Sequence, residues 1–166
     1  MTASRRTVQR SAALGLGITL LGDGWLCAQP VVSDGDPWAA WHALPAASDY
    51  PDPRVRAVSC AILAPNAMNL QPWLVRLVGD DRLQLFVNLS RRLPVSDLPD
   101  RHLTVSFGTF TELMVIAASD SGHELDVEPF LTGEPMPRLD ARPLVTVQFA
   151  PRQGLARAPL LDQVLT

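Results

Sequence analysis

The chain has 166 residues, of which 47% are hydrophobic and 19% are charged, enough for one domain with its own core. Its formal net charge is −3, and every basic side chain is Arg because the sequence contains no Lys. An acidic chain offers no electrostatic surface for nucleic acid or for an anionic membrane. The sequence has no Gly-x-Ser-x-Gly elbow, phosphate-binding loop or Cys-x-x-Cys pair. Acyl transfer, nucleotide hydrolysis and thiol redox chemistry therefore lack their usual residues.

The first 28 residues have the organisation of an export signal. A basic head without acids is followed by a moderately apolar segment, 11–22, which is too short to cross about 30 Å of hydrocarbon. Arg5 and Arg6 resemble a twin-arginine signal, although Val and Gln stand where Phe and Leu usually follow. Cleavage is expected after Ala28 and leaves 11 Arg and 16 acidic residues, a net charge of −5. We therefore expect an exported, periplasmic protein with no membrane attachment after signal removal.

Residues 29–52 contain four prolines with Asp, Ser and Gly between them, which predicts a linker or irregular arm. Within this segment, Trp38 and Trp41 are spaced for one short helical turn that docks through its indole rings.

Cysteine and histidine indicate neither a disulfide nor a metal centre. Only Cys27 and Cys60 are present, and Cys27 leaves with the signal. Cys60 lies in an apolar segment, where a small buried hydrophobe is the simplest interpretation. The three His residues are too far apart in the sequence for metal-ligand spacing, so no metal site is expected.

Residues 53–166 contain helix and strand patterns and form the predicted domain. Asp52 and Pro53 predict a helix start, with Asp as the cap and Pro in the first turn. Two strand patterns, Trp73–Val78 and 83–87, flank a four-residue turn and predict a hairpin. The later pattern predicts a long helix over 100–121, strands over 124–130 and 144–149, and an amphipathic helix from 159. The sequence therefore predicts an α+β fold, with an antiparallel or mixed sheet flanked by helices.

The segment 64–73, APNAMNLQPW, joins the first helix to the first strand of that hairpin. Its side-chain amides, on Asn66, Asn69 and Gln71, provide donors and acceptors together and could bind the edge of a planar heterocycle. Asn and Pro are also common in turns for backbone reasons alone, so a purely structural turn is the alternative.

This segment resembles the flavin-contacting turn of the nitroreductase family, Pro-Ser-x-x-Asn-x-Gln-Pro-Trp, with Asn66 in the usual Ser position. The resemblance implies that Pro65, Asn66, Asn69 and Gln71 line an FMN site. It covers residues 53–166, and the stretch 91–122 resembles a subgroup of exported nitroreductase-like proteins. In that subgroup two nitroreductase-like halves are fused in one chain, about twice as long as this one.

The sequence departs from the family at the FMN phosphate. The Arg-Arg-Ser-x-Arg motif that holds the phosphate in nitroreductases is missing before Asp52. Arg91 and Arg92 form an adjacent pair later in the chain, and a solvated pair held by Asp97 and Asp100 is its simpler interpretation. We therefore expect an N-terminal half, incomplete as a nitroreductase-like domain, with half of a flavin site. A second nitroreductase-like half or a homodimer is the expected partner.

The resemblance also places the long helix between the two halves. Its apolar side chains are then expected to be exposed in the isolated chain: Phe107, Phe110, Leu113 and Met114. A patch of that kind is rare on soluble monomers, so dimerisation or aggregation is expected.

The implied function is that of an FMN-dependent oxidoreductase, which takes electrons from NAD(P)H or another reductant and passes two to nitro or quinone-like acceptors. Export agrees with this, because the twin-arginine route carries proteins already folded around a cofactor. No side chain of the chain is predicted to act as acid, base or nucleophile. The alternatives are a flavin-binding or flavin-sequestering protein without turnover, and an inactive remnant.

Overall fold

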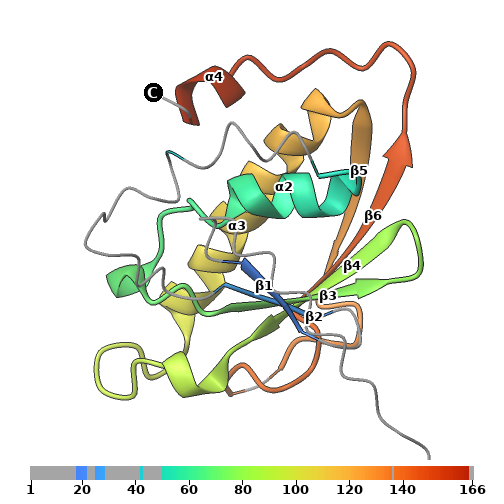
Figure 1. The fold of residues 1–166 in the computed structure, drawn as a ribbon. Helices are drawn as coiled ribbons and strands as arrows, with labels where there is room; N and C mark the ends of the chain where they lie inside the picture. Colours follow the sequence, from blue (N-terminus) through green and yellow to red (C-terminus); the bar gives the residue numbers. More distant parts are fainter. Residues whose placement is uncertain (1–17, 22–24, 29–41, 43–49, 136, 165–166) are drawn as a thin grey trace, which may run out of the picture.

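The computed structural model describes residues 18–21, 25–28, 42, 50–135 and 137–164, which form a mixed α and β fold (Figure 1). Its elements in chain order, with η for a 3-10 helix, are β1 (Ile18–Leu21), β2 (Trp25–Ala28), α2 (Pro53–Ala61), η3 (Ala67–Asn69), β3 (Trp73–Val78), β4 (Arg82–Val87), η4 (Leu89–Arg91), α3 (Arg101–Asp120), β5 (His123–Pro129), β6 (Val145–Pro151) and α4 (Leu161–Val164). The predicted α+β class, an antiparallel sheet flanked by helices, is confirmed. The predicted basic head and the predicted turn with Trp38 and Trp41 lie outside the described residues.

The strands form one sheet in the order β1-β2-β3-β4-β6-β5, and all neighbouring strands are antiparallel. β1 and β2 come from the residues that the sequence analysis assigns to the export signal, and β2 pairs with β3. In the β3–β4 hairpin Val78 pairs with Arg82, so the turn is one residue shorter than predicted. Gly79 begins that turn at φ +55°, a conformation that glycine adopts without strain.

The start of α2 is capped as predicted and is also tied to the β3–β4 turn. The Asp52 carboxylate accepts a hydrogen bond from the backbone N–H of Arg54 at 2.9 Å. The Arg54 guanidinium, which is buried, donates to the carbonyls of Gly79 at 2.7 Å and Arg82 at 2.9 Å. Arg54 therefore contacts the capping residue of its own helix and also donates to carbonyls of a neighbouring turn. These contacts fix α2 on the sheet.

The core lies between the sheet and the helices α2 and α3, which lie side by side on one face of the sheet (Figure 1). Alternate residues of the strands point into this core, as the two-residue period of a strand requires. Trp73, at the start of β3, packs edge-on to Phe107 with ring centroids 6.2 Å apart. It also packs against Phe110 with centroids 4.8 Å apart.

The expectation that the apolar side chains of α3 are exposed is wrong. Phe107, Phe110 and Met114 are each at most 1% exposed, and Leu113 is half-buried against the same core. The apolar stripe of α3 is covered by the sheet of its own chain, so it needs no partner to leave water. The argument for dimerisation from these side chains therefore fails.

The interpretation of Cys60 as a small buried hydrophobe is confirmed. Its side chain is 3% exposed and contacts Ile116 of α3 and Leu161 of α4. Burial raises the pKa of the Cys60 thiol to about 11, so the group stays protonated at neutral pH. Within the described part of the chain, no helix combines the length and the apolar composition needed to cross a bilayer.

Candidate functional site

The segment predicted to contact flavin forms a turn between α2 and β3 with three residues in the left-handed region. Met68, Asn69 and Gln71 have φ of +53°, +52° and +47°. None of them is glycine, and although Asn tolerates such a φ, Met and Gln adopt it uncommonly. Strained backbone of this kind persists only where surrounding groups determine it, and it is concentrated at functional sites.

Asn66 holds the turn from within. Its side-chain nitrogen donates to the carbonyl of Ala64 at 3.0 Å, and its side-chain oxygen accepts from the backbone N–H of Gln71 at 2.8 Å. The amide of Asn66 is therefore engaged on both sides by the backbone of the turn. Among the predicted site residues, Asn66 shapes the turn, as an Asx side chain commonly does.

Three further side chains hold the turn from outside, and none was predicted to do so. Ser106 accepts from the backbone N–H of Ala67 at 3.1 Å, and Thr109 donates to the carbonyl of Pro65 at 2.8 Å. Both hydroxyls lie on α3. Arg91 donates through Nη1 to the carbonyls of Leu70 at 2.9 Å and Gln71 at 2.8 Å.

Asn69 and Gln71 are the site residues whose amides face outward or stay available. Asn69 is exposed, and its side-chain oxygen lies 3.4 Å from the Asn66 nitrogen, at the long limit of a hydrogen bond. Gln71 is half-buried, and its side-chain amide makes no hydrogen bond with another described residue. Met68, which precedes Asn69, is 80% exposed. The turn therefore presents two amides and a thioether at the surface on a fixed backbone.

The predicted arginine pair divides between two tasks. Arg91 holds the turn, and Arg92 reaches a buried acid at the start of α3. Arg92 Nη2 lies 3.0 Å from Asp100 Oδ2 as an ion pair. Arg91 and Arg92 were interpreted as a solvated pair held by Asp97 and Asp100. Of this interpretation, only the contact between Arg92 and Asp100 is found.

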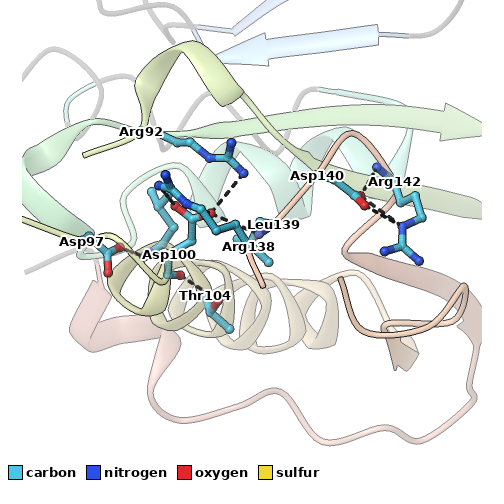
Figure 2. Close-up of polar contacts among 9 residues, drawn as sticks. Arg92, Asp97, Asp100, Thr104, Arg138, Leu139, Asp140 and Arg142 are labelled. Carbon is cyan, nitrogen blue, oxygen red and sulfur yellow. Dashed lines mark hydrogen bonds and ion pairs between the residues drawn. The ribbon is translucent and has the colours of Figure 1, made fainter. Parts of the chain in front are cut away.

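Asp100 is the centre of a buried ion cluster (Figure 2). The residue is 0% exposed and takes φ +56° as it leads into α3. Its carboxylate accepts from Arg138 Nη2 at 2.7 Å and Nε at 3.2 Å, and from the backbone N–H of Leu139 at 3.1 Å. Figure 2 shows Arg92 and Arg138 approaching this carboxylate from two different loops.

Because Asp100 faces the arginines, another acid caps the helix. The Asp97 carboxylate accepts from the backbone N–H of Leu103 at 3.1 Å, in the first turn of α3. Burial of Asp100 opposes its ionisation, but the hydrogen bonds from Arg138 and the charge of Arg92 outweigh burial and hold its pKa below the ordinary value of 3.8. The cluster is therefore ionised at neutral pH and ties the start of α3 to two loops.

Among the described residues, no group of three or more His, Cys, Asp or Glu side chains could hold a metal ion. No family model matches the sequence, and no curated protein matches it.

Proposed function

We propose that this chain supplies the isoalloxazine-binding turn of an FMN site of nitroreductase type. The observation that carries the proposal is the backbone of residues 66–71, which has three non-glycine residues at positive φ and is held by side chains from α3 and the loop after β4. Such a turn fixes the backbone that carries the amides of Asn69 and Gln71 before a ligand arrives. Their donors and acceptors suit the polar edge of a planar heterocycle.

The phosphate end of the cofactor requires a second contributor. Arg91 is the guanidinium that reaches the turn, and its Nη1 is already engaged by two carbonyls. We therefore assign the phosphate-binding arginines to a second nitroreductase-like half or to a second copy of this chain. When bound, the flavin supplies two-electron transfer from NAD(P)H or another reductant to a nitro or quinone-like acceptor.

In a protein that also supplies the second half of the site, replacing Asn69 with Ala is expected to weaken FMN binding about ten- to a hundredfold, because a buried flavin group then loses its partner at about 1–3 kcal/mol. Asn69 is exposed, so the fold should be unaffected. The measurement is a titration of FMN followed by the quenching of flavin fluorescence. Gln153→Ala is the matched control, because it removes an exposed amide beyond β6. An Asn69→Ala affinity within twofold of the parent contradicts the assignment of the turn.

Reduction of the FMN-loaded protein distinguishes an enzyme from a flavin-sequestering protein. Anaerobic addition of NADPH to the FMN-loaded protein bleaches the flavin absorbance if the bound cofactor accepts a hydride. Bound flavin that stays oxidised with every reductant identifies a binding protein without turnover.

Export through the twin-arginine route is proposed from the charged pair Arg5 and Arg6. Changing both to Lys keeps the charge, but transport by this route should be abolished because its receptor recognises the guanidinium pair. The measurement is the amount of protein in periplasmic and cytoplasmic fractions of cells that express either form. Export of the Lys form in cells that lack the general secretory pathway would exclude the twin-arginine route.

A further inference from the structure

A groove of about 340 Å³ lies between α3 and the end of the β5–β6 pair, away from the amide turn. Its walls are mainly apolar and include Phe107, Val115, Val127, Phe130, Leu144 and Val145. The volume is at the small end of the range for sites that bind small molecules, and it suits two or three fused rings.

Two residues in the walls of this groove are locally unfavourable for the fold. Gly108 is exposed in the middle of α3, where glycine destabilises a helix relative to Ala, and a Cβ at this position meets nothing within 4 Å. Phe130 takes φ +54°, which is strained for an aromatic residue, and both its N–H and its carbonyl are hydrogen-bonded there. Packing therefore does not explain Gly108, whose missing side chain leaves the groove open.

The rim of the groove carries one carboxylate. Glu112 is exposed and makes no hydrogen bond or ion pair with another described residue. The two lining hydroxyls are already used, because Thr104 donates to the carbonyl of Asp100 and Thr111 to that of Phe107. An occupant consequently meets apolar and aromatic walls with a single negative charge at the edge.

We propose that this groove binds a planar aromatic cation of two or three fused rings. The apolar walls suit a flat ligand, the partly exposed ring of Phe130 attracts positive charge, and Glu112 complements that charge from the rim. The site is separate from the amide turn. Ser106 and Thr109 contact the turn from one side of α3, whereas positions 104, 108, 111 and 115 line the groove from another.

Proflavine is a suitable probe, because it is a fluorescent tricyclic cation at neutral pH, and acridine is its neutral counterpart. Proflavine should saturate one site per chain. Glu112→Gln should lower the affinity for proflavine about threefold to fivefold, as expected for an exposed charge pair. Acridine binding should not change in that variant. Glu128→Gln is the matched control, since Glu128 is exposed on β5 outside the groove. Equal proflavine affinities for the Glu112→Gln and Glu128→Gln variants overturn the charge assignment.

Filling the groove tests the site itself. Gly108→Leu should lower proflavine affinity by at least about tenfold, because the new side chain occupies the ligand volume. Gly108→Ala should fold with a raised Tm and keep most of the binding, which shows that loss in the Leu variant is not unfolding. Proflavine binding by Gly108→Leu within twofold of the parent overturns the proposal. A change of oligomeric mass in the same variant, measured by light scattering, also overturns it, because the groove is then a contact between copies. Asn69→Ala should leave proflavine affinity unchanged, so this result is independent of the flavin proposal.

Discussion

The Asp100→Asn variant is expected to have a free energy of unfolding about 3 kcal/mol below that of the parent, as for a buried ion pair that loses one partner. Asn has the same size and tolerates the φ of +56° at this position, so the backbone is not the cause. The carboxylate that Arg92 and Arg138 share is lost instead, and the amide nitrogen of Asn is a donor facing other donors. The start of α3 and two loops lose their common anchor.

Urea denaturation followed by circular dichroism measures the loss. Asp140→Asn is the matched control, because Asp140 forms an ion pair with Arg142 in which both side chains are exposed (Figure 2). Surface pairs of this kind contribute little, so the control should unfold with the parent. Equal midpoints for the two variants would show that the buried cluster contributes no more than an exposed pair.

The same cluster makes the stability of the fold depend on pH in the acid range. The pKa of Asp100 is below its ordinary value of 3.8 in the folded protein, so the unfolded chain takes up this proton first as the pH falls. The stabilisation by Asp100 is therefore present above pH 3.8 and is lost as the pH falls through the folded-state pKa. The difference in stability between the parent and Asp100→Asn should accordingly narrow in acid.

Trp73→Ala is expected to lower the free energy of unfolding by about 4 kcal/mol, the usual range for removing a buried Trp. Trp73 is 1% exposed and contacts two aromatic rings of α3, so its removal leaves a cavity between helix and sheet. Thermal unfolding followed by circular dichroism measures the change.

Trp73→Phe is the matched variant. The buried Trp73 Nε1 group has no hydrogen-bond partner among the described residues, so Phe removes an unsatisfied donor while keeping an aromatic ring against Phe110. We expect a loss below about 1.5 kcal/mol. A loss as large as that of the Ala variant would mean that the indole nitrogen contributes a contact of its own.

The elements that the sequence predicted well have local causes. The cap at Asp52, the proline that follows it and the left-handed Gly122 each bound a helix through their own backbone preferences. β3 was placed correctly because it is a short, mainly apolar run that follows a proline and ends at a glycine. These features need no knowledge of distant parts of the chain.

The features that could not be predicted from the sequence depend on contacts between residues far apart along the chain. Asp100 and Arg138 are 38 residues apart, and Arg138 lies in a loop with no motif to mark it. Asp97 and Asp100 stand before a helix, where either could be its cap, and only the loop geometry decides which one binds arginine. The prediction that the apolar side chains of α3 are exposed failed for a different reason. It rested on the family resemblance and not on the apolar periodicity of the helix, which by itself indicates a face packed on the core.

Because β2 pairs with β3, the proposed removal of the export signal would alter the edge of the sheet. Cutting after Ala28 takes away β1 and β2 together, and β3 then becomes an edge strand with unpaired backbone groups along one side. Natural proteins protect such edges with charge or with covering segments, because an open edge recruits strands from other chains. In β3 the charged residue is Arg76, exposed among apolar neighbours. If residues 1–28 are removed as the proposed export signal, this edge of β3 is uncovered only after cleavage, and pairing with another chain is expected to follow processing.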